Sequence, residues 1–228
     1  LLYNLYPHKQ YLVLTHNRPL NNDLQSRFMR LSGKLPENIE FRTFQGWCFQ
    51  HWPQDLVWID PLSEPQRKQF ARQAWKKHLV KTNVTEGMLL SEINWMQDQP
   101  SLTKETYLQA DRGGRGFALS AAQRELLFAA SEAYQEILRV NAARDWNEAP
   151  RCIWHALQEK PEDFPQYDVI LIDETQFFAP MWIQIIQRLL RDKNAHLFMV
   201  ADPTQGFLGR GSSWKSLGLE ARGRTHRL

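Results

Sequence analysis

The stretch that decides the fold reads YDVILIDETQ and spans residues 167–176. Its centre, VILI at 169–172, is a continuous run of apolar residues, which is typical of a strand buried on both faces of a parallel sheet. Two acids, Asp173 and Glu174, follow this run immediately. Ligands of parallel α/β sheets gather at the carboxyl ends of the strands. The stretch therefore predicts a buried strand with polar side chains at the edge where ligands bind.

Strands and helices alternate on both sides of this stretch. An apolar helix is predicted at 180–191 and a second buried strand at 196–200, which reads HLFMV. Near the start of the chain, strands are predicted at 11–15 and 39–44, with a helix between them that Asn22 or Asp23 caps and that ends at Gly33. This alternation favours an α/β fold built on a parallel sheet.

The middle of the chain has a helical pattern instead. Helices are expected from the SEPQ segment at 63–66 to about residue 81, over 91–98 and over 121–140, where apolar residues recur three and four positions apart. A helical segment of this length is too large for a loop. We therefore expect residues 1–52 and 166–228 to form the sheet domain, and residues 53–165 to form a helical inserted subdomain.

The composition is that of an ordinary globular protein and excludes disordered, collagen-like and coiled-coil chains. The 228 residues are 43% hydrophobic and carry a formal net charge of +3, which by itself identifies no nucleic-acid partner. No apolar run is long enough to span a membrane and the first residues lack the pattern of a signal peptide, so a cytoplasmic location is expected. Cys48 and Cys152 have no CxxC partner and are predicted to be free, buried thiols.

The paired acids allow two interpretations. In P-loop nucleotidases, a first carboxylate after a strand holds magnesium and a second one polarises the attacking water. Alternatively, Asp173 or Thr175 simply caps the helix that follows. A second polar turn, ADPTQ at 201–205, favours the nucleotidase interpretation, because a neighbouring parallel strand would bring Gln205 beside Glu174.

Five segments, in order, resemble the motifs of the UvrD/Rep superfamily 1 helicases. DETQ at 173–176 with FFAPMW after it is similar to motif II, and ADPTQ at 201–205 is similar to motif III. LTHN at 14–17 with Leu20 resembles motif Ia, TFQGWC at 43–48 resembles motif Ib, and the segment 223–228 resembles the approach to motif IV. The resemblance implies a RecA-like first motor domain, of the P-loop NTPase type, with a helical insert of the 1B kind.

This resemblance also implies a function, namely an ATP-dependent DNA helicase or translocase that uses ATP and Mg²⁺ and moves on single-stranded or forked DNA as a monomer. Asp173 would coordinate magnesium and Glu174 would act as general base. Gln205 would couple the γ-phosphate to DNA, with Gln176 and Asp202 near the nucleotide. The residues implied to contact DNA are Thr15, Asn17, Thr43 and Phe44, with Trp214 or Phe207 as a candidate stacking platform.

The sequence departs from the family pattern in one respect. No GxxxxGK[ST] loop is present, and the only Gly-Lys pair, Gly33-Lys34, is followed by Leu35. We therefore expect a fragment of a longer protein, lacking the second motor domain and inactive by itself. The alternative is a noncatalytic, helicase-like module that binds nucleic acid. A third hypothesis, a metal nuclease site, would use Asp163, Asp168, Asp173 and Glu174.

Two basic features remain open. The loop DRGGRG at 111–116 would either contact phosphate or expose its arginines to solvent. The basic stretch from Arg67 to Lys81 allows the same two interpretations. The seven histidines form no metal-binding pattern.

Overall fold

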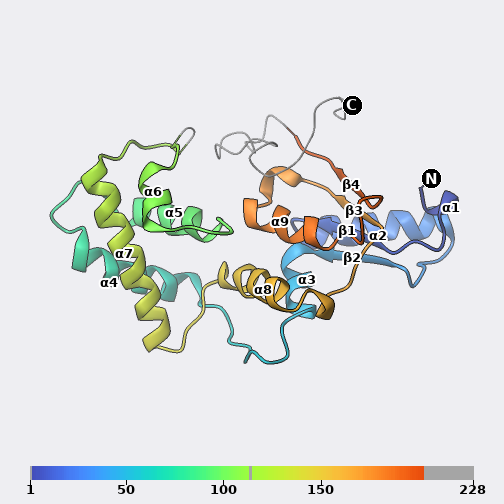
Figure 1. Cartoon of the computed structure of the whole chain (residues 1–228), viewed down its shortest axis with the longest axis horizontal. Coiled ribbons are helices and arrows are strands. Elements are labelled where there is room, and N and C mark those ends of the chain that lie inside the picture. Colours follow the sequence, from blue (N-terminus) through green and yellow to red (C-terminus); the bar gives the residue numbers. More distant parts are fainter. Residues whose placement is uncertain (1, 113–114, 203–228) are drawn as a thin grey trace.

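The computed structural model describes residues 2–112 and 115–202. Its sheet consists of β1 (Tyr11–Thr15), β2 (Ile39–Thr43), β3 (Val169–Ile172) and β4 (His196–Met199). All pairings are parallel, and the spatial order is β2-β1-β3-β4 (Figure 1). The α/β fold with a parallel, RecA-like sheet and flanking helices is thus confirmed. In the described part of the chain, no helix has both the length and the apolar character needed to cross a membrane.

Helices cover both faces of the sheet. One face packs against α3 (Phe44–Gln50), α8 (Glu148–Glu159) and α9 (Pro180–Arg188), which together with Leu12, Leu14, Ile170 and Ile172 of the strands form the largest apolar core. The other face packs against α2 (Arg18–Ser32), whose Leu24 and Phe28 contact a second cluster containing Tyr11, Ile39, Phe41 and Val169. Successive strand residues point to opposite faces, so β1 and β3 need apolar residues at almost every position.

β4 differs from its prediction as a fully buried strand. It is the outer strand of the sheet, and its exposure alternates along the chain, with Phe198 43% exposed. Val200, just after the strand, is 51% exposed. Among the described residues, no strand pairs with the outer edge of β4.

Two helix starts also differ from the sequence prediction. α2 begins at Arg18, because the Asn17 side chain accepts a hydrogen bond from the Leu20 backbone N–H (2.9 Å) and so caps the helix earlier than Asn22 or Asp23 would. The end of α2 at Gly33 is confirmed, with a left-handed φ of 77° at that glycine. α3 begins at Phe44, which was expected to be the last residue of the strand at 39–44, because the Thr43 hydroxyl caps the helix.

Four helices form a separate packing unit. α4 (Glu64–His78), α5 (Glu86–Gln97) and α7 (Ala121–Val140) surround their own apolar core, in which Leu127, Ala130, Tyr134 and Leu138 form the buried face of α7. α6 (Lys104–Gln109) packs against α7 through the rings of Tyr107 and Phe128. Figure 1 shows this helical unit beside the sheet and its helices. The sequence predicted α4, α5 and α7 but not α6 or α8.

α8 packs with the sheet rather than with the helical unit. Its buried residues Ile153, Trp154 and Leu157 belong to the same core as the strands. The core of the helical unit, by contrast, extends from Leu62 to Leu138, with Ala143 packed against it. The packing therefore changes between Ala143 and Glu148, earlier in the chain than the expected boundary at residue 165.

The chain enters and leaves the helical unit side by side. Pro61 and Arg144 form an isolated parallel bridge, and the Leu62 backbone N–H donates to the Arg144 carbonyl oxygen (2.8 Å). The next residue, Asp145, is 1% exposed and forms an ion pair with Arg67 of α4 (2.9 Å). The Tyr134 hydroxyl of α7 also donates to Asp145 (2.9 Å). One buried carboxylate thus joins the exit segment to two helices of the unit.

A second buried carboxylate explains the glycine- and arginine-rich loop. Glu92 of α5 is fully buried and pairs with Arg112 (2.5 Å) and Arg115 (2.8 Å), and it accepts a hydrogen bond from the Tyr107 hydroxyl (3.0 Å). The Arg115 guanidinium also lies 4.2 Å from the centre of the Trp95 ring. Burial lowers the pKa of Arg115, and the charge of Glu92 opposes that effect. The expectation of solvent-facing arginines was therefore wrong, since the side chains of Arg112 and Arg115 are buried against Glu92, whereas a phosphate contact stays a prediction.

Arg67, at the start of the basic stretch, is likewise buried in its pair with Asp145. Both cysteines are free, but only Cys48 is fully buried, whereas Cys152 is half-buried. Burial raises the pKa of the Cys48 thiol, which keeps it protonated.

Candidate active site at the carboxyl edge of the sheet

The polar segments that follow the four strands lie at one edge of the sheet. The strands are parallel and in register, with Leu14 of β1 opposite Ile172 of β3, and Ile172 opposite Met199 of β4. Thr15 ends β1, Asp173 directly follows β3, and Asp202 lies three residues beyond β4. The parallel pairing of β3 with β4 therefore brings Asp202 to the same edge of the sheet as Asp173.

Backbone hydrogen bonds hold the acidic pair in place. The Asp173 backbone N–H donates to the Leu14 carbonyl oxygen (3.0 Å), which extends the pairing of β1 and β3 by one residue. The Asp173 carboxylate then accepts a hydrogen bond from the Glu174 backbone N–H (2.9 Å). On the other side, the Thr175 N–H donates to the Val200 carbonyl oxygen (2.9 Å). The acids are therefore fixed between the ends of β1 and β4.

Glu174 has an unusual backbone conformation. Its φ of 56° and ψ of 43° lie in the left-handed region, which residues other than glycine seldom occupy and which costs on the order of 1 kcal/mol. The turn lets Thr175 pair with the end of β4, while the side chain of Glu174 stays half-buried at the sheet edge. Such conformations are concentrated at functional sites.

The Gln176 side chain connects the acids to the segment after β4. This residue is 2% exposed, and its amide Nε2 donates a hydrogen bond to the Glu174 carboxylate. Its Oε1 accepts a hydrogen bond from the Asp202 backbone N–H (3.1 Å). An amide donates and accepts at the same time, whereas a carboxylate in this place would only accept. Gln176 thus links the end of β3 to the segment after β4, so that a movement of one would displace the other.

The four described residues expected to contact DNA fall into two groups. Asn17 is exposed and Thr43 half-exposed, and their side chains cap α2 and α3. The α3 cap requires a glycine at position 46, because a Cβ there would lie 2.9 Å from the Thr43 hydroxyl oxygen. DNA contacts of Asn17 and Thr43 stay predictions.

Thr15 and Phe44 have structural roles instead. The buried Thr15 hydroxyl donates to the Asn17 carbonyl oxygen (3.0 Å). Phe44 is 1% exposed and stacks on Trp182 with ring centres 4.6 Å apart. Because both side chains are enclosed, the described conformation offers neither of them to a ligand.

An aromatic pair that the sequence did not reveal lies between the ends of β1 and β3. The rings of His16 and Phe177 are stacked with centres 4.8 Å apart. They line a cavity of about 290 Å³, whose other walls include Trp146, Arg67 and Asp145. The proximity of His16 to Phe177 depends on the pairing of β1 with β3, which lie more than 150 residues apart in the chain, so no local pattern could have indicated it.

The acids of the nuclease hypothesis do not converge. Asp168 precedes β3, where it accepts a hydrogen bond from the Gln10 N–H (2.8 Å) and pairs with Arg191 (3.3 Å). Asp173 follows β3, so the two acids lie at opposite edges of the sheet, about 16 Å apart at 3.3 Å per residue. Asp163 lies in the short helix η1 (Pro161–Asp163). This hypothesis is therefore wrong.

Two site residues lie outside the described part of the chain, namely Gln205 and Trp214, as does the alternative stacking residue Phe207. Within the described part, no three His, Cys, Asp or Glu residues are grouped as a metal centre built from protein ligands alone would require. Asp173 and Glu174 do supply carboxylate oxygens, and Mg²⁺ in nucleotide sites is commonly bound by one or two such groups together with phosphates.

Comparison with known proteins gives one family. The sequence model of the UvrD/REP helicase N-terminal domain matches residues 1–210. No curated protein matches the chain significantly.

Proposed function

Because this chain belongs to the UvrD/REP helicase family, we propose that it is part of an ATP-dependent DNA helicase or translocase that couples ATP hydrolysis to movement on single-stranded DNA. The observation that carries the proposal is the hydrogen-bond chain from Glu174 through Gln176 to the backbone of Asp202. It joins a candidate catalytic carboxylate to the segment after the neighbouring strand. A motor protein requires such a connection, because ATP hydrolysis at the nucleotide must change the conformation of the parts that contact DNA.

The side chains at this edge suit ATP and Mg²⁺. Bound Mg²⁺ would neutralise phosphate charge while ATP supplies the phosphoryl group for transfer to water. Asp173 would hold the metal, and its position is fixed by the Glu174 N–H and by the pairing to β1. Glu174 would accept the proton of the attacking water. The hydrogen bond from the Gln176 amide to Glu174 orients that carboxylate.

Gln176 and Asp202 would transmit changes at the nucleotide. A shift of the Glu174 carboxylate would pull on the Gln176 amide and, through it, on the segment that leads to Gln205. We propose that Gln205 contacts the γ-phosphate and that Asn17 and Thr43 contact the DNA backbone at the neighbouring strand ends.

The 228-residue chain by itself is expected to hydrolyse no ATP above background. Its sequence contains no GxxxxGK[ST] loop to hold the phosphates, so its carboxylates have no positioned nucleotide to act on. Phosphate release with and without single-stranded DNA measures this directly. Robust DNA-stimulated hydrolysis by the isolated chain would contradict the proposal that these carboxylates need a GxxxxGK[ST] loop to position the nucleotide.

Two substitutions of Asn17 separate capping from DNA contact. Asn17→Ala is expected to lower the free energy of unfolding by about 1 kcal/mol, because the cap on the Leu20 N–H is lost. Asn17→Asp keeps the cap, since aspartate caps helices as well as asparagine does. It is nevertheless expected to weaken the binding of single-stranded DNA, because it places a negative charge against the phosphates.

Urea denaturation measures the free energy of unfolding of each variant, and fluorescence anisotropy with a labelled oligonucleotide measures its affinity for single-stranded DNA. Asn22→Asp serves as the control for the added negative charge, because Asn22 is exposed on α2 and the substitution changes the net charge by the same amount. If Asn17→Asp bound DNA as tightly as the unaltered chain, the assignment of Asn17 to the DNA interface would be wrong.

A further inference from the structure

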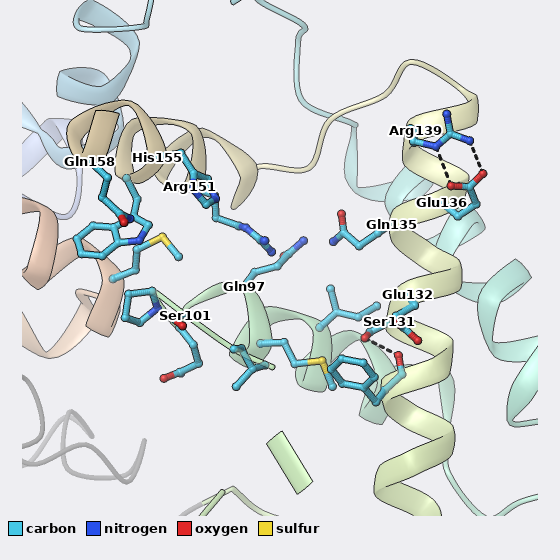
Figure 2. A pocket seen from close by; sticks show the side chains of 18 residues that line it. Gln97, Ser101, Ser131, Glu132, Gln135, Glu136, Arg139, Arg151, His155 and Gln158 are labelled. Carbon is cyan, nitrogen blue, oxygen red and sulfur yellow. Dashed lines mark hydrogen bonds and ion pairs between the residues drawn. The ribbon is translucent and has the colours of Figure 1, made fainter. Parts of the chain in front are cut away.

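A cavity of about 790 Å³ lies between the helical unit and the helices of the sheet (Figure 2). Its walls come from the end of α5 and the loop after it, from α7, and from α8 with the start of α9. The volume is in the range of sites for small organic ligands. The cavity contains neither Asp173 nor Glu174 and is therefore separate from the candidate active site.

Three polar side chains converge in this cavity. Figure 2 shows Gln97 of α5, Gln135 of α7 and Arg151 of α8 pointing toward one another across it. Gln97 is 3% exposed, and its Nε2 donates a long hydrogen bond to the Asp145 carboxylate (3.5 Å), whereas its Oε1 is buried without a hydrogen-bond partner among the described residues. An unpaired buried acceptor costs on the order of 1–3 kcal/mol, so it requires an explanation.

Arg151 differs from the other arginine in the cavity wall. The guanidinium of Arg139 makes two hydrogen bonds to Glu136, at 2.8 and 2.6 Å. The guanidinium of Arg151, which is half-buried, makes no hydrogen bond or ion pair with any described residue, and neither does the Gln135 amide. The wall of the cavity thus contains one buried, unpaired acceptor, together with an amide and a guanidinium that bond to no described residue.

The charge of the lining argues against an anion as ligand. Glu132 and Glu136 balance Arg139 and Arg151, so these four charged side chains of the wall are formally neutral together. A carboxylate or phosphate, moreover, only accepts hydrogen bonds and would leave the Gln97 Oε1 unpaired. A purely apolar ligand would leave all three polar groups unpaired.

We propose that this cavity binds a nucleobase, supplied either by a free nucleoside or by an unstacked base of a single strand. Every nucleobase carries a donor beside an acceptor on one rigid edge, and arginine and glutamine are side chains that read such edges. The acceptor of the base would face Arg151 and its donor would face Gln97, while Gln135 can pair with either. Phe128, Trp154 and Met181 provide apolar and aromatic surface against the base faces.

The direct test titrates the unaltered chain with adenosine, guanosine, cytidine and uridine, using saturation-transfer NMR. At least one nucleoside is expected to bind with micromolar to millimolar affinity. Arg151→Met and Gln135→Leu are each expected to weaken that binding about tenfold or more, since each removes a partner of the base edge. Neither residue is fully buried, so both variants are expected to keep their fold, which thermal unfolding checks.

Arg139→Met is the matched control, because this arginine is already bonded to Glu136, and it is expected to change the affinity less than twofold. A single-stranded oligonucleotide that displaces the nucleoside identifies an unstacked base as the natural source. A nucleoside that remains bound identifies a free one. The proposal is overturned if no nucleoside binds, if Arg151→Met and Gln135→Leu bind as well as the unaltered chain, or if inorganic phosphate displaces the nucleoside.

Discussion

Replacing Glu174 by glutamine is expected to lower DNA-stimulated ATP hydrolysis by about 10²- to 10⁴-fold when the chain is tested joined to a GxxxxGK[ST] loop and a second motor domain. The amide cannot take a proton from the attacking water. It is nearly the same size as the carboxylate, so the left-handed turn at residue 174 and the pairing of Thr175 with Val200 should persist. Hydrolysis should therefore fall while DNA affinity and thermal stability stay nearly unchanged.

Glu162→Gln is the matched control, because Glu162 is exposed in η1, away from the carboxyl edge of the sheet. It is expected to hydrolyse ATP at the unaltered rate. Asp173→Asn should also reduce hydrolysis, and raising the Mg²⁺ concentration should partly restore the rate in that variant only, since Asp173 is the proposed metal ligand. Full activity of Glu174→Gln would favour the alternative of a noncatalytic helicase-like module that binds nucleic acid.

Asp145→Ala is expected to lower the free energy of unfolding by about 3–5 kcal/mol, as is typical when one partner of a buried ion pair is removed. The two oxygens of Asp145 lie 2.9 and 3.0 Å from the Arg67 Nε, and the carboxylate also accepts from the Tyr134 hydroxyl (2.9 Å). Burial disfavours the charge of Arg67, but Asp145 outweighs that effect, and the pKa of Arg67 is raised. Without Asp145, the buried Arg67 would lose its carboxylate partner and keep the hydrogen bond to Asn94, and the Tyr134 hydroxyl would lose its acceptor.

Urea denaturation of the chain measures this loss. Asp23→Ala provides the comparison, because the Asp23–Arg27 pair is similarly short (2.8 Å) but has side chains 45% and 65% exposed. Exposed pairs contribute about 0–1 kcal/mol, so this control should unfold almost as the unaltered chain does. The double variant Arg67→Met with Asp145→Leu should recover part of the loss, because it leaves no unpaired charge. A loss below about 1 kcal/mol for Asp145→Ala would contradict the role assigned to this carboxylate.

The sequence was most informative where neighbouring residues decide the structure. The apolar run at 169–172 and the strand at 11–15 were found because buried parallel strands leave continuous apolar patterns. The helix at 121–140 was found with the bounds it has in the structure, because its buried face recurs at helical spacing. The order of the motifs also led to the correct family.

Long-range packing accounts for what the sequence did not reveal. Phe44 follows a strand end and was expected to face a ligand, yet the approach of α9 brings Trp182 onto its ring and encloses it. Arg112 and Arg115 are in a loop typical of an exposed turn, but Glu92, some 20 residues away, draws them inward. The association of α8 with the sheet likewise depends on partners far along the chain.

The bridge between Pro61 and Arg144 has a consequence for how such a protein can be altered. Because the chain departs and returns at neighbouring points, the more than 80 residues between them are connected to the sheet covalently at one place, and the Met181 N–H of α9 also donates to the Asp98 carbonyl oxygen after α5 (3.0 Å). The helical unit has its own apolar core, so it can be enlarged, exchanged or lost without rethreading the strands around the candidate active site. The sheet, which carries the candidate active site, is thus structurally separable from the helical unit, whose sequence can change independently.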